Sequence, residues 1–107
     1  MEISEIRITL RDDDKLRGFA SITLDNCFVV RGLKVIEGAQ GMFVAMPNRR
    51  RRDGSFQDIA HPINMKTREW MENMIIVAYK EEIARFERGE ISLPLPGADD
   101  SAMEETY

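Results

Sequence analysis

The first half of the chain alternates between hydrophobic and polar residues. Residues 3–10 place aliphatic side chains on one face and polar side chains on the other: Ile6, Ile8 and Leu10 against Arg7 and Thr9. Residues 16–24 repeat the pattern, with small or aliphatic side chains at every second position. Alternation with a period of two is typical of a β-strand that buries one face. We therefore predict two strands, separated by a polar turn.

The alternating segments continue as far as position 60. Positions 25–26, Asp-Asn, predict a tight hairpin turn because asparagine tolerates a positive φ angle, and residues 28–36 follow as a third strand. Gly32 interrupts this strand and predicts a bulge or a bend. Residues 42–46 form a short apolar strand, and residues 55–60 return as a fifth. Short connections between these segments favour antiparallel pairing.

The second half has helical periodicity. Hydrophobic residues recur at spacings of three and four: Met71, Met74, Ile75, Ala78, Tyr79, Ile83 and Phe86. This spacing places an apolar stripe along one side of an α-helix. Asn64 or Thr67 is expected to cap its start, with Arg88 in its last turn and Gly89 as the C-cap residue. The sequence therefore predicts an α+β fold, with a small antiparallel β-sheet of about five strands followed by one long C-terminal helix.

Charge divides the chain into two parts. The 107 residues fit a single domain, which we place at residues 1–89. That domain carries all 15 basic side chains, whereas residues 90–107 carry none. The later segment instead holds five acidic residues and two prolines: Glu90, Asp99, Asp100, Glu104, Glu105, Pro94 and Pro96. It is predicted to be a disordered acidic tail, so the net charge of −4 says little about the domain.

Composition excludes several classes of protein. The single cysteine, Cys27, rules out an intrachain disulfide framework and a multi-thiolate metal site, and it suits a reducing, cytoplasmic setting. No basic segment followed by an apolar core opens the chain, so we expect no signal peptide. The longest nearly apolar stretch, residues 74–79, falls far short of the roughly 18–20 residues that span a bilayer. We expect no membrane contact and no cofactor.

Four consecutive cations form the strongest local feature: Arg49, Arg50, Arg51 and Arg52. This arginine cluster is predicted to lie in a polar loop that ends in the turn dipeptide at positions 53–54. Guanidinium groups match phosphate oxygens bidentately and also stack on bases, which favours a polyanion partner. The competing interpretation is a solvated loop whose charges keep the edge of the sheet from pairing with other chains.

Three further residues extend this hypothesis, each with an ordinary structural alternative. Phe56 could stack on an unpaired base, although a phenylalanine beside a strand is more often part of the core. Lys66 and Arg68 lie where a helix is expected to begin, and backbone N–H groups there also attract anions. They either extend the basic surface or are simply exposed residues of the first turn.

Catalytic chemistry has little support in the sequence. His61 precedes a proline beside an apolar run, which favours a structural histidine over a general base. Cys27 is expected to be a small core residue rather than an activated thiolate. Asp12, Asp13 and Asp14 lack the spaced ligands of a calcium loop and are expected to form a turn. With no phosphate-binding loop, dinucleotide fingerprint or nucleophile elbow, we expect neither an enzyme nor a small-molecule substrate.

Two long segments carry a resemblance to a known family. ASITLDNCFVVRGLKVIEG (20–38) and GMFVAMPNRRRRDGSFQDIAHPIN (41–64), with Thr67 and Arg68, resemble the SpoVG family of bacterial sporulation and septation regulators. The resemblance covers about the first 70 residues, while the remaining helix and tail match only in general character.

The resemblance implies a sheet-plus-helix protein that forms homodimers, binds DNA and RNA site-selectively, and regulates gene expression, septation or sporulation. The basic pair of the family, its nucleic-acid-binding element, falls on Arg49 and Arg50. Arg51 and Arg52 depart from the family pattern, and Gln57 replaces a basic residue. The basic surface is therefore expected to be redistributed, with greater general affinity for polyanions.

Two functions from different classes follow. The first is a dimeric nucleic-acid-binding regulator that uses the arginine cluster with Lys66 and Arg68. The second is a protein-interaction module that acts on the division machinery without contacting nucleic acid, for example by β-augmentation. A further hypothesis is that the acidic tail folds back onto the arginine cluster and competes with nucleic acid.

Overall fold

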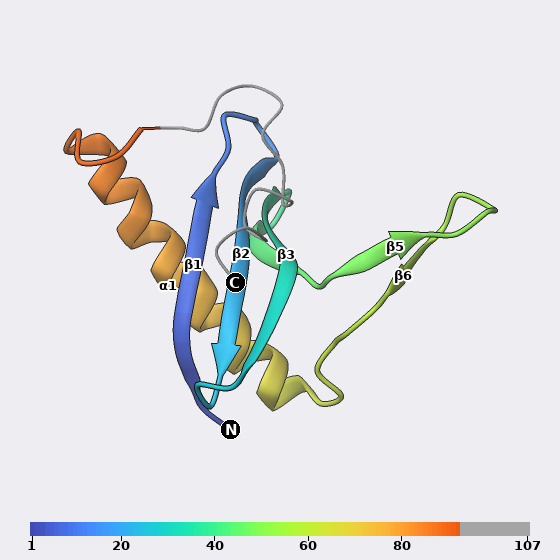
Figure 1. The fold of residues 1–107 in the computed structure, drawn as a ribbon. Helices are drawn as coiled ribbons and strands as arrows, with labels where there is room; N and C mark the ends of the chain where they lie inside the picture. The colour runs from blue at the N-terminus through green and yellow to red at the C-terminus, as the bar shows by residue number, and fades with distance from the viewer. Residues whose placement is uncertain (93–107) are drawn as a thin grey trace.

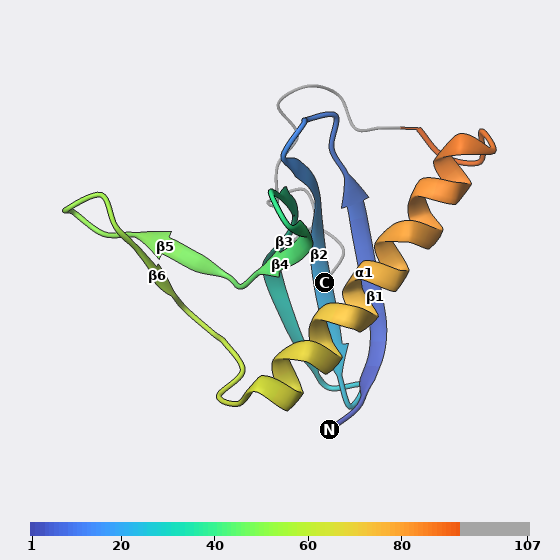
Figure 2. The ribbon, with the colours of Figure 1, turned by 180° about the vertical axis from the view of Figure 1, so that it is seen from behind.

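The protein has an α+β fold, as predicted, with one helix packed across one face of an antiparallel sheet (Figure 1). The computed structural model describes residues 1–92, so the predicted disorder of the tail lies largely outside the described residues. Four strands form the sheet in the order of the sequence: β1 (Ile3–Leu10), β2 (Leu16–Leu24), β3 (Phe28–Gly38) and β4 (Gly41–Ala45). Helix α1 (Met65–Glu87) lies behind them in Figure 1 and in front in Figure 2.

Local backbone requirements explain the strand connections. Asp25 and Asn26 both adopt positive φ angles, 50° and 57°, in the turn between β2 and β3. Gly32 has a φ of 82° and lies with Arg31 opposite the single residue Ser21, which confirms the predicted bulge. Cys27 was expected in the core but is exposed. That expectation is wrong because the turn extends through position 27 before the strand begins.

The core lies between the helix and the sheet. Cross-strand neighbours on the covered face form two rows of aliphatic and small residues: Ile8, Ala20 and Leu33; Leu10, Gly18, Val35 and Val44. From α1, Met71, Ile75 and Tyr79 pack against them at intervals of four residues. Met74 and Phe86 belong to the predicted stripe but remain 40% and 37% exposed. The helix thus contacts the sheet along a narrower line than the periodicity predicts.

Two contacts fix the helix start and its position against the sheet. Asn64 is the N-cap residue, and its Oδ1 accepts a hydrogen bond of 2.7 Å from the Thr67 amide, which settles the choice between the two predicted caps. Farther along α1, Glu72 Oε2 accepts a 3.3 Å hydrogen bond from the Val44 amide of β4. A helix carboxylate therefore satisfies a backbone donor of the edge strand.

The largest departure from the predicted architecture lies between Pro47 and the helix. β5 (Asn48–Arg50) and β6 (Phe56–Asp58) form a separate two-stranded sheet that projects from the four-stranded one (Figure 1). Arg49 and Arg50 are therefore strand residues, and the predicted loop is confined to the turn after them. Pro47 has no N–H to continue the β4 ladder. Its carbonyl instead accepts a 2.7 Å hydrogen bond from the Ile59 amide, which closes the base of the hairpin.

Candidate nucleic-acid interface

The turn of the β5–β6 hairpin is held by its own backbone and by one carboxylate. The Arg51 amide donates to the Ser55 carbonyl at 2.7 Å, and the Gly54 amide donates to the Arg51 carbonyl at 3.0 Å. Gly54 has a φ of 90°, a left-handed conformation that favours glycine. Asp53 Oδ1 accepts hydrogen bonds from the hydroxyl and the amide of Ser55, and these bonds lower the pKa of Asp53.

The four residues of the arginine cluster lie in this hairpin, two at the end of β5 and two directly after it. All four side chains are exposed, and none of the ion pairs found within residues 1–92 involves them. Arg49 lies opposite Gln57, and Arg50 lies opposite Phe56. Because adjacent strand residues point to opposite faces, Arg49 and Arg50 occupy different faces of the ribbon, and Arg51 and Arg52 lie in the turn. The cluster is thus a cationic arm rather than a single flat patch.

Phe56 shares its ribbon face with Arg50 and is 68% exposed. The expectation that such a residue belongs to the core is wrong here, because a two-stranded ribbon with no second layer cannot bury either face. An exposed aromatic ring beside a guanidinium group is an arrangement that can hold a base by stacking and the adjoining phosphate by charge.

Lys66 and Arg68 lie at a separate place. They belong to the first turn of α1, which contains no acidic residue, with Lys66 exposed and Arg68 half-buried. Figures 1 and 2 both place this turn of the helix away from the tip of the hairpin. Within one subunit, therefore, these cations do not form a continuous surface with the arginine cluster. An anion bound there would relieve their repulsion with the positive end of the helix macrodipole.

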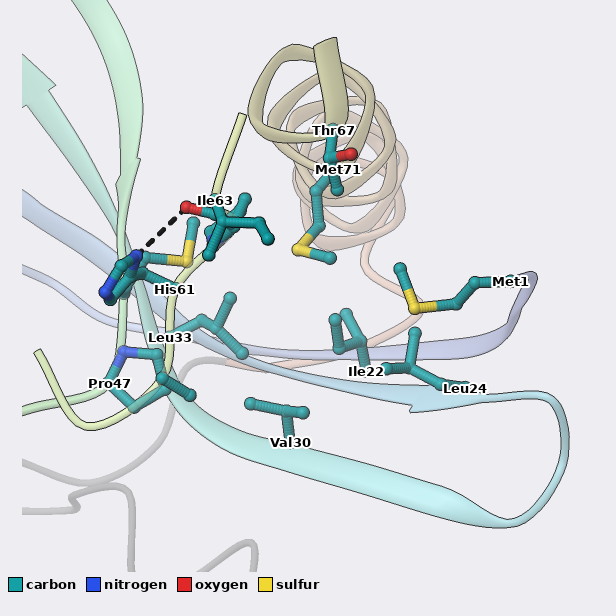
Figure 3. Close-up of a pocket in the computed structure, with 13 residues that line it drawn as sticks. Met1, Ile22, Leu24, Val30, Leu33, Pro47, His61, Ile63, Thr67 and Met71 are labelled. Atoms are coloured by element: carbon teal, nitrogen blue, oxygen red, sulfur yellow. Dashed lines mark hydrogen bonds between the residues drawn. The ribbon is translucent and has the colours of Figure 1, made fainter. Parts of the chain in front are cut away.

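An apolar pocket lies between the base of the hairpin, the sheet and the start of the helix (Figure 3). It measures about 360 Å³ and is lined mostly by aliphatic and methionine side chains, including Leu24, Val30, Met46, Ile63 and Met71. Sequence reasoning missed this pocket, because its walls come from segments that are far apart in the chain. Its chemistry suits an apolar side chain or ligand.

The predicted non-catalytic roles can be compared with the structure directly. His61 lies at the pocket rim, exposed, with its Nδ1 3.0 Å from the carbonyl oxygen of the adjacent Pro62. Asp13 Oδ1 accepts hydrogen bonds from the Lys15 and Leu16 amides, which confirms the predicted turn and lowers the pKa of Asp13. Within residues 1–92, no group of three or more His, Cys, Asp or Glu side chains is arranged to hold a metal ion.

The fold and the hairpin together define a small sheet-and-helix protein with an exposed cationic arm. The only helix among residues 1–92 is not long and apolar enough to cross a membrane. Residues 1–81 match the SpoVG family, and the chain belongs to that family.

Individual relatives agree with this assignment. A Bdellovibrio bacteriovorus protein that carries the septation-protein name SpoVG is 47% identical over 102 residues, covering 92% of this chain and 94% of the relative. A SpoVG protein of an Anaeromyxobacter species is 53% identical over 85 residues, or 79% of this chain and 88% of the relative. One from Agathobacter rectalis is 51% identical over 84 residues, covering 78% of this chain and 97% of the relative.

Proposed function

We propose that this protein is a dimeric regulator that binds DNA or RNA through its cationic hairpin. The observation that carries the proposal is the arginine cluster, four exposed guanidinium groups on an arm that makes no contribution to the core. The one carboxylate within the turn, Asp53, is hydrogen-bonded to Ser55 instead of to an arginine. The cluster is thus available to phosphate oxygens, and the ring of Phe56 adds a stacking surface.

Several finer features of the proposal come from the family. Relatives bear names that refer to septation. We infer that this protein acts in the cytoplasm and regulates septation or sporulation by controlling gene expression. A binding protein rather than an enzyme is expected. Lys66 and Arg68 provide a second phosphate contact on the same subunit, at the helix start.

The proposed homodimer rests on apolar surface beside the pocket. Three large apolar side chains between β6 and the first turn of α1 are at least two-thirds exposed: Ile59 at 67%, Ile63 at 90% and Met65 at 67%. Several exposed apolar side chains within one short segment favour an interaction site. A two-fold dimer formed here would bring two hairpins to one nucleic acid.

Binding is tested with single-stranded DNA, duplex DNA and RNA in fluorescence-anisotropy titrations at low and physiological salt. Replacing all four arginines of the cluster by glutamine should abolish most of the affinity and flatten its dependence on salt. A matched control removes four cations elsewhere, at Lys15, Lys80, Arg85 and Arg88, and should bind nearly as the unmodified protein does. If the two variants bind alike, the hairpin is not the site.

The dimer is tested separately by light scattering. A mass near twice the 12.3 kDa of one chain is expected, and Ile63→Glu should return it to the monomer value without unfolding the protein, because Ile63 is 90% exposed. A monomer at micromolar concentration for the unmodified protein would contradict the dimer.

The same apolar surface also favours the second candidate, a protein-interaction module. A partner retained from nuclease-treated lysate at moderate salt, and lost with Ile63→Glu, would support it. The combination of such a partner with no nucleic-acid binding would replace the first proposal.

A further inference from the structure

The four-stranded sheet has a second face that no helix or strand among residues 1–92 covers, the face turned to the viewer in Figure 1. Cross-strand pairing identifies its side chains. One row runs through Thr9, Phe19, Lys34 and Ala45, and the next pairs Arg7 with Ser21. Arg31 lies in the bulge opposite Ser21. We call this surface the open sheet face.

Cations dominate the open sheet face. Arg7, Arg31 and Lys34 belong to it by register, and the guanidinium carbon of Arg11 lies 5.6 Å from the centre of the Phe19 ring. Within residues 1–92, the strand register places one carboxylate, Glu5, on this face, where it forms an ion pair with Arg7, and Arg31 also has an interaction partner. The solvated face of an antiparallel sheet needs only polar side chains. An excess of one sign over several strands is what attracts a polyanion.

Two polar atoms on this face are buried without a hydrogen-bond partner among the described residues. Ser21 is fully buried, and its Oγ makes no hydrogen bond within the described residues. Arg11 Nη1 is also shielded from solvent and likewise has no hydrogen-bond partner there. Leaving a buried donor unpaired costs about 1–3 kcal/mol. The Arg11 guanidinium lies over the ring of Phe19, which is 6% exposed, and rotation of this long side chain toward a phosphate would satisfy Nη1 and uncover the ring.

A second aromatic ring is already accessible on this face. Phe43 pairs with Ile36 across β3 and β4 and is 42% exposed. Its ring packs on Gly38, where an added Cβ would come within 3.0 Å, so a side chain at Gly38 would displace it. A fixed, exposed ring next to basic residues is the arrangement on which unpaired bases stack.

The open sheet face leads toward the arginine cluster. Ala45 of β4 is the cross-strand partner of Lys34, and Arg49 follows four residues later. At most about 14 Å of extended chain therefore separates the two positions. A strand of nucleic acid held by the hairpin would reach Lys34 after crossing this short segment, residues 45–48, which carries no basic residue.

We propose that the open sheet face is a further phosphate-binding surface, on which a single-stranded nucleic acid continues from the hairpin. This inference rests on the proposed function, because it needs a protein that binds nucleic acid. A single strand is the occupant, since the face offers the exposed ring of Phe43 to an unpaired base. Acidic turns bound both ends of the sheet, with Asp12, Asp13 and Asp14 at one end and Asp25 at the other. The strand would thus cross the middle of the sheet.

The test compares Arg11→Gln/Lys34→Gln with the charge-matched control Lys15→Gln/Lys80→Gln in the full-length protein. The ligand is a single-stranded oligonucleotide of about 20 nucleotides, long enough to leave the hairpin. The first variant should bind more weakly and reduce the slope of log K against log salt by about 1.4, the value for two phosphates lost from a single strand that crosses the sheet face of one subunit. The control should keep the slope and the affinity of the unmodified protein.

The outcomes separate this inference from the proposed function. If the glutamine variant of the arginine cluster loses binding while Arg11→Gln/Lys34→Gln matches its control, the sheet inference fails and the proposed function stands. If the unmodified protein binds no nucleic acid, both fail. An equal loss on duplex DNA, or a change of mass in light scattering, overturns the single-strand assignment. Thermal melting confirms that each variant is folded.

Discussion

Arg49 and Arg50 are adjacent in sequence, yet the hairpin register predicts that they contribute unequally to binding. Arg50 shares a ribbon face with the exposed ring of Phe56, whereas Arg49 lies on the opposite face with Gln57. A nucleic acid that stacks on Phe56 places its phosphates near Arg50. We therefore expect Arg50→Gln to weaken binding strongly and Arg49→Gln to weaken it little.

The magnitude follows from the number of phosphates that the protein neutralises. If each hairpin of a dimer neutralises one phosphate fewer on single-stranded DNA, the slope of log K against log salt falls by about 1.4. Between about 50 and 200 mM salt, the affinity of such a variant should fall by a factor about sevenfold smaller than for the unmodified protein. Arg49→Gln should leave the slope within the error of the unmodified protein.

The assay is a salt titration of anisotropy with the single variants, the double variant and Phe56→Leu, which keeps an apolar side chain but removes the ring. Phe56→Leu should weaken binding while leaving the salt slope unchanged, because stacking releases no counterions. Equal slopes for Arg49→Gln and Arg50→Gln, each reduced to the same extent, would refute the reasoning from the ribbon faces.

Three further predictions concern the scaffold and the turn. Glu72→Ala removes the acceptor for the Val44 amide and should lower the free energy of unfolding by about 1 kcal/mol in urea titrations; a change in binding alone, with unaltered stability, would contradict this. Ile75→Ala leaves a cavity at a fully buried position and should cost about 2–5 kcal/mol in the same assay, and a loss below this range would show that the core collapses around it. The Ser55 hydrogen bonds lower the pKa of Asp53 below its ordinary 3.8, so their stabilisation of the turn is present above that pH and is lost as the pH falls through the folded-state pKa. The Ser55 amide resonance should follow this transition by NMR, whereas Asp53→Asn should abolish it.

The sequence predicted the elements of the scaffold because their patterns are local. Alternation in residues 3–10 and the spacing of Met71, Ile75 and Tyr79 each reflect burial against a single layer, and both signals were correct. The bulge at Gly32 was also predictable from a local signal, because the positive φ angle at that position favours glycine.

The parts that the sequence did not predict depend on contacts between distant segments. The predicted fifth strand pairs with β5 instead of joining the four-stranded sheet. Pro47 interrupts the β4 ladder, and its carbonyl accepts a hydrogen bond from the Ile59 amide that closes the separate hairpin. The sequence pattern predicts that Phe56 belongs to the core, and this prediction fails because, within residues 1–92, no second layer packs on the β5–β6 ribbon. Similarly, the apolar pocket and the open sheet face exist only once the register is known.

The hairpin also affects which mutations this protein can tolerate. A two-stranded ribbon without a core is marginal by itself, and here its side chains contribute nothing to the packing between α1 and the sheet. Substitutions in it therefore cost the domain little folding stability, whereas truncations at the buried positions Ile22 or Ile75 cost about 2–5 kcal/mol. If the arm binds nucleic acid as proposed, its contribution to ligand preference can change through mutations in the arm alone, on an unchanged scaffold.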